Sequence, residues 1–166
     1  MEFGIRALAI GDRDWVRQVL TEHWGAAVIV NRGRVHQADR LPGLVAMDAA
    51  EPVGLLTYHV ENGQLEVVTL NSWVEGQGIG TALLEGAEAV ARSQDCRRLW
   101  LVTTNDNVPA IEFYQRRGLR LVAVHRGAVN EARKLKPQIP THGIGGVPMT
   151  DELEFALEFG AAAKED

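Results

Sequence analysis

Hydrophobic and polar positions in the first fifty residues predict short strands around one helix. Apolar residues between Phe3 and Leu8 predict a first strand, and apolar residues at helical spacing between Trp15 and His23 predict an amphipathic helix. Two short apolar runs, Ala27–Val30 and Leu44–Met47, predict two further strands. The polar stretch 35–39 between them carries no clear signal. We therefore expect the N-terminal part to be mostly antiparallel sheet.

A predicted hairpin follows and leads into a glycine-rich turn. Val53–Val60 predicts one strand. Leu65–Leu70 predicts its antiparallel partner, because the turn at 61–63 ends in a glycine that tolerates positive φ. Beyond the glycines, apolar residues at helical spacing predict a helix over 79–90. The chain therefore runs strand, glycine turn, helix.

This glycine turn suits an anionic ligand. The first N–H groups of a helix have no internal partner and lie at the positive end of its dipole. Glycines at 76, 78 and 80 let a phosphate approach the main chain. No Walker Gly-Lys-Ser/Thr follows, and Thr81 or Leu83 stands where a dinucleotide fingerprint needs its third glycine. A turn that only packs a helix against a strand stays open at this point.

The second half of the chain repeats the order strand, helix, strand. Arg97–Thr103 predicts a strand, and Asn107 predicts the cap of a helix with Pro109 in its first turn. Gly118 predicts the end of that helix, and Leu119–Val124 the next strand. Such crossovers imply a partly parallel sheet joined to the antiparallel strands.

A long loop and a last strand are expected towards the C-terminus. Residues 126–150 are rich in glycine and proline, with one short helix indicated near 130–135. Loops of this length in a compact domain are usually functional or mobile. Apolar residues alternate with acidic ones over 152–159, which predicts a half-exposed strand. The Ala-rich tail to Asp166 is expected to fray.

Composition bounds the class of protein. A chain of 166 residues buries a core without staples, so we expect one domain over 1–166. The net charge of -5 argues against a nucleic-acid partner. Cys96 is the only cysteine, so no internal disulfide can form, and a small buried hydrophobe is expected there. The sequence has no leader pattern and no apolar run of ~18 residues, so we expect a cytoplasmic protein without a membrane partner.

Two segments together resemble the GNAT superfamily of N-acetyltransferases. Residues 74–84, VEGQGIGTALL, resemble its pyrophosphate-binding motif. Residues 107–119, NVPAIEFYQRRGL, resemble its second signature, Asn-x-x-Ala-x-x-Phe-Tyr followed by glycine and an apolar residue. One departure is Glu75, where that motif usually opens with Arg or Gln. Since the cradle is mainly backbone N–H, we expect Glu75 to point to solvent.

The resemblance implies a fold and a co-substrate. The fold is a mixed α/β acyl-CoA N-acyltransferase fold, with antiparallel N-terminal strands joined to parallel central strands and flanking helices. Acetyl-CoA is the implied donor, without a metal. The strand edge at Leu70 would pair with the pantetheine arm, and the N–H at or beside Leu70 is a candidate oxyanion donor. The implied cofactor-binding residues are Leu70, Ser72, Gln77, Gly78, Gly80, Thr81, Asn107, Ala110, Phe113 and Tyr114.

The resemblance also implies catalytic roles. Tyr114 matches the general acid, since a phenol of pKa ~10 stays protonated at neutral pH and can donate to a thiolate. A core aromatic beside Phe113 is the alternative. An amine acceptor needs a base. Glu66 is the candidate, on the expectation that it shares a strand face with Val68 and Leu70. An exposed strand glutamate, or His59 as the base, are the alternatives.

Several other residues have open roles. His23 and Trp24 either line a substrate pocket or pack into the core. Arg116 and Arg117 either bind the 3'-phosphate of CoA or serve the helix dipole and solvent. The basic segment 126–136 either rims the acceptor site, meets a CoA phosphate or forms a solvated face.

The expected activity follows from the resemblance. It is transfer of an acetyl group from acetyl-CoA to an unidentified primary amine, by direct attack through a tetrahedral intermediate. The enzyme class is that of acyltransferases transferring groups other than aminoacyl groups. The alternative is an acyl-CoA-binding regulatory module without turnover. Acetyl-CoA and an amine are the expected partners, and a homodimer is left open.

Overall fold

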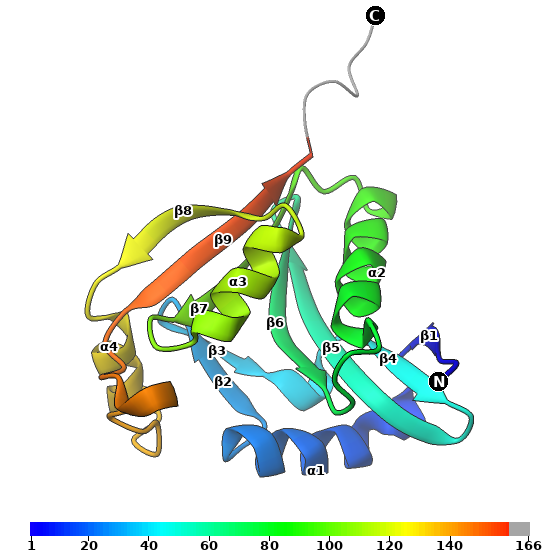
Figure 1. Cartoon of the computed structure of the whole chain (residues 1–166), viewed down its shortest axis with the longest axis horizontal. Coiled ribbons are helices and arrows are strands. Elements are labelled where there is room, and N and C mark those ends of the chain that lie inside the picture. The colour runs from blue at the N-terminus through cyan, green and yellow to red at the C-terminus, as the bar shows by residue number, and fades with distance from the viewer. Residues whose placement is uncertain (160–166) are drawn as a thin grey trace, which may run out of the picture.

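The computed structural model describes residues 1–159, so the tail that the sequence predicts to fray lies outside the described residues. Within them, one mixed sheet has the strand order β1-β4-β5-β6-β7-β9-β8 (Figure 1). The strands are β1 Gly4–Ala7, β4 Gly43–Asp48, β5 Glu51–Glu61, β6 Gln64–Ser72, β7 Arg98–Thr104, β8 Arg120–His125 and β9 Glu152–Glu158. The expected mixed α/β fold is confirmed.

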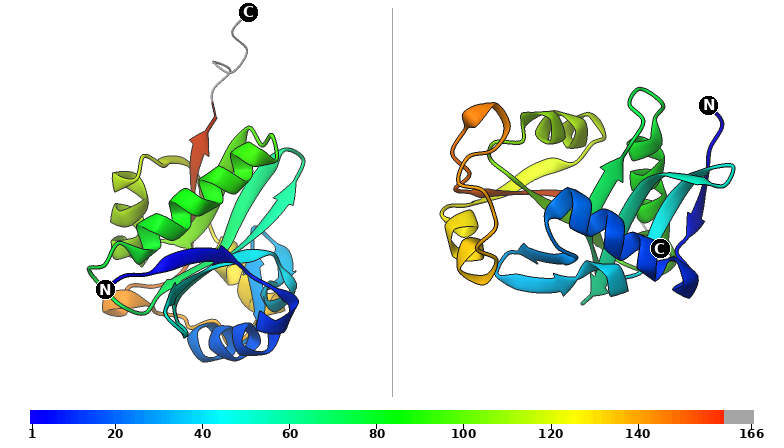
Figure 2. Two further views of the ribbon diagram at one scale, coloured as in Figure 1. Left: turned by 90° about the vertical axis from the view of Figure 1, so that its right-hand side faces the viewer. Right: turned by 90° about the horizontal axis from the view of Figure 1, so that it is seen from below.

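Helices cover both faces of this sheet. The first long helix α1 and the second, α2, lie on opposite sides of the strands (Figure 2). The helices are α1 Arg13–Trp24, α2 Ile79–Ser93, α3 Val108–Arg116 and α4 Ala128–Leu135, with short 3-10 turns η1 Ile10–Asp12, η2 Ala38–Arg40 and η3 Ile144–Gly146. Helix α4 lies where the sequence indicates a short helix within the segment 126–150.

A separate two-stranded hairpin lies beside the main sheet. Its strands are β2 Val28–Asn31 and β3 Arg34–Gln37, and they pair antiparallel. The stretch 35–39, which carries no signal in the sequence, therefore supplies most of β3 and the start of η2. Polar residues form this strand because its pairing with β2 satisfies the backbone.

Two hydrophobic cores flank the sheet. The larger lies between the sheet and helices α2 and α3, and it includes Leu83, Leu101 and Phe155. The smaller lies under α1 and includes Leu20 and Leu55. Cys96 is buried in the larger core, as expected, and burial raises the pKa of its thiol.

The central strands separate after a short parallel contact. β6 and β7 pair only where Gln64–Glu66 of β6 lies beside Arg98–Trp100 of β7. Beyond that point the two strands diverge, and the edge of β6 that faces β7 has no ladder there. The second crossover reaches β8, but β9 lies between β7 and β8 and pairs antiparallel with both. The strand β9 thus enters the sheet between β7 and the edge strand β8.

A β-bulge in β6 reverses the faces of that strand. Thr57 pairs with Thr69 but Tyr58 pairs with Val67, so one residue, Val68, has no partner. Val67 and Leu70 both pack into the larger core, whereas Val68 packs into the smaller one. The prediction that Glu66 shares a face with Leu70 is therefore wrong, because simple alternation does not continue through a bulge.

Candidate active site

The glycine turn before α2 has the geometry of an open anion cradle. Gly76 and Gly78 have φ of 74° and 75°, in the left-handed region where glycine carries no penalty. Gly78 immediately precedes the helix, and within residues 1–159 no side chain caps this end. Glu75 and Gln77 are exposed, so the expectation that Glu75 points to solvent is confirmed. Free N–H groups and a positive helix end are thus open to a ligand.

Helix α3 is packed directly against the start of α2. A Cβ built on Gly80 would lie 3.1 Å from Cζ of Phe113, so only glycine allows this approach without displacement. Arg117 joins the helices, since its Nε donates to Oγ1 of Thr81 at 2.7 Å. Its guanidinium lies 3.9 Å from the ring centroid of Phe113. Arg117 therefore holds a cation at the glycine turn, whereas Arg116 pairs with Glu112 on the surface.

A cavity of about 190 Å³ opens where β6 and β7 diverge; we call it the splay cavity. It is enclosed by the two strands, by one side of α3 and by residues from α1, β2 and β9. Its lining residues are Trp24, Ile29, Asn31, Val67, Val68, Thr69, Leu70, Leu101, Val102, Thr103, Thr104, Asn107, Ala110, Tyr114 and Glu152. The structure thus brings together four of the predicted site residues: Leu70, Asn107, Ala110 and Tyr114.

Local sequence explains how α3 presents Tyr114 to this cavity. Oδ1 of Asn107 accepts the N–H of Ala110 at 3.2 Å and caps the helix. Tyr114 then follows one turn after Ala110, on the same side of the helix. Its ring lies 5.5 Å from Phe113 and 6.0 Å from Phe155, between centroids. Burial raises the pKa of Tyr114 to about 12, so its hydroxyl stays protonated at neutral pH.

Two other predicted cofactor-binding residues lie at the rim. Ser72 is exposed at the end of β6, and its hydroxyl donates to the carbonyl of Val74 at 3.2 Å. Phe113 connects the two halves of the site, because it contacts Gly80 on one side and Tyr114 on the other. The glycine turn and the splay cavity are therefore neighbours.

The two predicted bases lie elsewhere. Glu66 is 1% exposed, and its Oε1 is 3.2 Å from Nε2 of His36. With His59 it lines a separate cavity of about 90 Å³. His59 itself lies between Arg34 and Glu61. Neither side chain is brought to the splay cavity with Tyr114, and the bulge in β6 accounts for the position of Glu66.

Glu152, at the start of β9, is the carboxylate in the splay cavity. It is 4% exposed, and its Oε1 accepts the N–H of Arg32 at 3.0 Å. Burial raises the pKa of Glu152. The sequence predicts the acidic face of this strand to be exposed, which holds for Glu158 but is wrong for Glu152 and Glu154. Glu154 is 5% exposed and is held by Arg32, Arg98 and His125. The alternation of apolar and acidic residues predicted the strand, but it did not predict which face of the strand other segments bury.

A second cavity of about 450 Å³, here called the distal cavity, continues from the first. The two share five lining residues: Trp24, Ile29, Asn31, Thr104 and Glu152. Helix α4 and the segment after it form its far wall. His23 also lines the distal cavity, and its Nε2 accepts from Nε1 of Trp73 at 2.8 Å. The interpretation of His23 and Trp24 as pocket residues therefore agrees with the structure.

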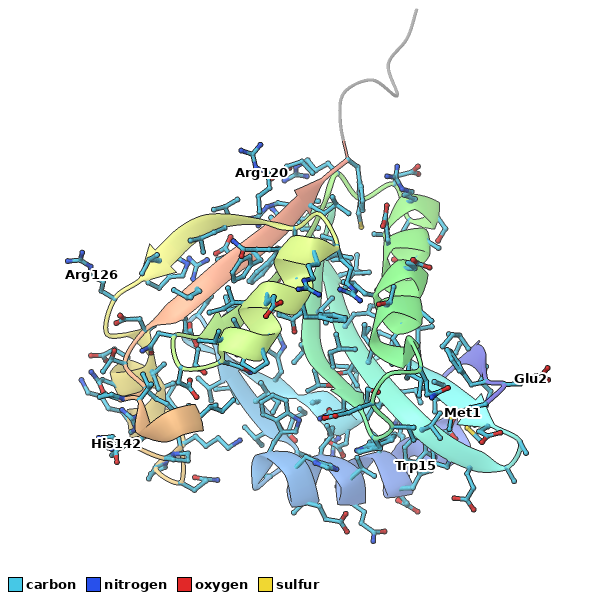
Figure 3. All side chains as sticks on the ribbon, in the orientation of Figure 1. Met1, Glu2, Trp15, Arg120, Arg126 and His142 are labelled. Carbon is cyan, nitrogen blue, oxygen red and sulfur yellow. The ribbon has the colours of Figure 1, made fainter. Side chains whose placement is uncertain are left out.

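The basic segment 126–136 divides between solvent and this wall. Arg126 is exposed and extends away from the ribbon (Figure 3). Arg133 donates to the carbonyls of Pro140 and Met149, which fastens α4 to the segment after it. Lys136 is 6% exposed and lines the distal cavity. This segment thus rims a cavity next to Tyr114.

Two features are absent from the described part of the chain. No group of three or more His, Cys, Asp or Glu side chains in residues 1–159 is placed to hold a metal ion. No helix in that part of the chain is long and apolar enough to cross a membrane.

Comparison with known proteins identifies relatives over most of the chain. The Acetyltransferase (GNAT) family matches residues 13–119. The Bacillus subtilis (strain 168) protein YdhI is 38% identical over 154 residues, which cover 90% of this chain and 96% of YdhI. YxbD of the same strain is 41% identical over 147 residues, covering 88% and 92%. Both are described as uncharacterized proteins.

Solved structures share the fold at low identity. An IAA acetyltransferase from Bacillus cereus has a TM-score of 0.72 at 17% identity, covering 95% of this chain and 99% of that one. A GNAT family acetyltransferase from Elizabethkingia anophelis, solved with acetyl-CoA bound, has a TM-score of 0.67 at 16% identity and covers 94% and 97%.

Proposed function

Because this chain belongs to the GNAT family of acetyltransferases, a class of acyltransferase enzymes, we propose that it moves the acetyl group of acetyl-CoA to a primary amine. One observation carries the proposal: an open helix start and a cavity with a protonated tyrosine are joined through Phe113. The first site suits a pyrophosphate and the second suits a thioester. A single extended ligand with both groups fits this arrangement.

The pyrophosphate of acetyl-CoA would lie at the start of α2. Backbone N–H groups of Gln77, Gly78, Gly80 and Thr81 would donate to it, and the helix dipole favours its charge. Arg117 adds a cation beside Thr81. This charge offsets the missing positive residue at Glu75, whose exposed carboxylate is screened by solvent.

The pantetheine arm would lie along the free edge of β6. β7 separates from β6 after Glu66, so the backbone groups along this edge of β6 are available to a strand-like ligand. The arm would run past Ser72 towards Leu70, with Asn107 and Ala110 on the opposite wall. The N–H at or beside Leu70 would then donate to the oxyanion of a tetrahedral intermediate.

Tyr114 would complete the transfer as general acid. The amine nitrogen attacks the thioester carbon, and collapse of the intermediate breaks the carbon–sulfur bond. The leaving thiolate forms in the same desolvated surroundings that raise the pKa of Tyr114 to about 12, and those surroundings disfavour both anions. Proton transfer from Tyr114 to sulfur therefore becomes more favourable as the bond breaks.

Other sequence predictions of this activity stay predictions. One of them is Glu66 as the base, although Glu66 lies beside His36 and lines a different cavity from the one that Tyr114 lines. A homodimer, and the choice between a small amine and a protein as acceptor, also stay open.

Two measurements test the proposal. Acetyl-CoA at about a hundred times its dissociation constant should stabilise the fold by roughly 2.7 kcal/mol, seen as a higher melting temperature. An unchanged melting temperature would refute acetyl-CoA as the ligand. Thiol release with a panel of amines then separates an enzyme from a binding module. A temperature shift without thiol release for any amine would favour the regulatory module.

A further inference from the structure

The wall of the distal cavity is mainly apolar. Residues from β2, α4 and the segment after α4 converge on it, and they are Ile29, Val30, Val129, Ala132, Ile139 and Met149. Val129 and Ala132 are 2% and 4% exposed, so helix α4 presents a packed apolar face here. A ligand that fills this space gains free energy by removing apolar surface from water.

Lys136 is the buried cation of this wall. Its ammonium donates to the carbonyls of Trp24 at 3.0 Å and Val28 at 2.8 Å. These bonds point the charge at the backbone of the α1–β2 connection. A second cation deep in the cavity would still be repelled by the charge of Lys136, because little water screens the two charges there. The cavity therefore disfavours an acceptor with several ammonium groups.

Glu152 lies where the distal cavity meets the splay cavity. Oε1 accepts the Arg32 N–H, and no hydrogen bond reaches Oε2 from the residues that the structure describes. Oε2 of Glu152 is not among the buried side-chain atoms of the described residues that lack a partner, so it is open to the cavity and can accept a hydrogen bond from a ligand. An ammonium group supplies both the donor and the opposite charge.

We infer that the distal cavity binds the body of the acceptor, which is an amine with one ammonium group on an apolar aliphatic or aromatic body, and that Glu152 receives this ammonium and takes its proton. The inference rests on the proposed acetyl transfer and names its substrate class and base. Glu66 is replaced in this role by a carboxylate that shares a cavity with Tyr114.

The proposed reaction releases one proton overall. The ammonium gives one proton to Oε2 of Glu152, which leaves a neutral amine whose lone pair attacks the thioester carbon. The nitrogen loses a second proton after the attack, and this proton replaces the one that Tyr114 gives to sulfur. The products are the amide, the CoA thiol and one proton, which passes from Glu152 to solvent.

Several charged groups lie around Glu152. Burial favours its protonated form, as does Glu66, whereas the N–H and charge of Arg32 and the charge of His125 favour the carboxylate. The charged or titratable groups that act on Glu152 or line a cavity with it are Arg32, Glu66, His125, Lys136, His23 and Tyr114. A raised pKa makes the carboxylate a stronger base towards an ammonium.

The first experiment measures amine binding without acetyl-CoA, by calorimetry. We expect 2-phenylethylamine and hexylamine to bind more tightly than spermidine. Glu152→Gln should weaken their binding by about tenfold or more, because a charged hydrogen bond is lost. Ala132→Leu should also weaken binding by filling the cavity, whereas Lys134→Leu, on the exposed side of α4, should not. Equal affinity for spermidine, or no effect of Ala132→Leu, would overturn the inference.

The second experiment measures thiol release with 2-phenylethylamine and saturating acetyl-CoA. Glu152→Gln should lower kcat by about a hundredfold or more and remove the acid limb of the pH profile. The variant should keep the melting-temperature rise with acetyl-CoA, which shows that the donor site is intact. A larger loss in Glu66→Gln than in Glu152→Gln, or an unchanged acid limb, would overturn the role of Glu152. Failure of acetyl-CoA binding in the unaltered protein would instead refute the proposed function, because amine binding is measured separately.

Discussion

Replacement of Tyr114 by phenylalanine separates catalysis from folding. Within residues 1–159, no hydrogen bond to the hydroxyl shifts its protonation, and burial raises its pKa. Removing it should therefore change the free energy of unfolding at neutral pH by less than about 1 kcal/mol. Both aromatic neighbours, Phe113 and Phe155, keep their contacts with the ring.

The catalytic cost of Tyr114→Phe should be much larger. Loss of a positioned general acid lowers kcat by about 10² to 10⁴, which is about 2.7 to 5.4 kcal/mol of transition-state stabilisation. Thiol release under saturating acetyl-CoA measures this directly. The melting-temperature rise with acetyl-CoA should persist, since Tyr114 lies beyond the pyrophosphate. If kcat stayed within a factor of two of the unaltered protein, Tyr114 would not be the acid.

The same variant has a signature in alkaline unfolding. Tyr114 has a pKa of about 12 in the fold against an ordinary 10.0, so the folded state holds its proton where the unfolded chain has lost it. Stability therefore falls as pH rises from about 10 to about 12, by up to roughly 3 kcal/mol from this group. Tyr114→Phe should lack that part of the decline. Parallel alkaline curves for the two proteins would refute the desolvated setting of the hydroxyl.

Three further changes probe other parts of the molecule. Arg117→Ala should weaken acetyl-CoA binding about tenfold in a calorimetric titration, while Arg116→Ala should change the affinity little. Equal effects of the two variants would exclude a phosphate contact by Arg117. Gly54→Ala should lower the free energy of unfolding by about 1 to 3 kcal/mol, because its Cβ would lie 2.5 Å from Cγ2 of Ile79. An unchanged denaturation midpoint would contradict the packing of α2 on β5. The hydrogen bond from Arg6 lowers the pKa of Asp12. The ionised Asp12 therefore stabilises the fold above the ordinary carboxyl pKa range, and this stability is lost as pH falls. Asp12→Asn should flatten this decline when the melting temperature is measured against falling pH.

Local sequence determined the parts of the site that local structure builds. The glycines before α2 and the cap of α3 by Asn107 act within a few residues, so spacing alone predicts where Tyr114 points relative to Ala110. The resemblance to the family rests on these same segments. For that reason the geometry of the glycine turn and of helix α3 was predictable.

The surroundings of Glu152, where we propose that the acceptor binds, depend on contacts between distant segments. Glu152 meets the N–H of Arg32, which is 120 residues earlier in the chain. Its strand enters the sheet between β7 and β8, and no local pattern shows that this buries the acidic face. The bulge at Val68 similarly moved Glu66 away from the face of Leu70. Tertiary structure interrupted the period-two pattern at Val68, and in β9 it changed which face is buried.

The most direct test of the account is a titration of acetyl-CoA into the protein and into its Gly78→Val variant. Gly78 has a φ of 75°, which a β-branched residue adopts only with strain, so the variant should distort the cradle at the start of α2. We expect one acetyl-CoA per chain for the unaltered protein, and binding that is at least tenfold weaker in the variant. No binding to the unaltered protein, or equal affinity in both, would contradict it.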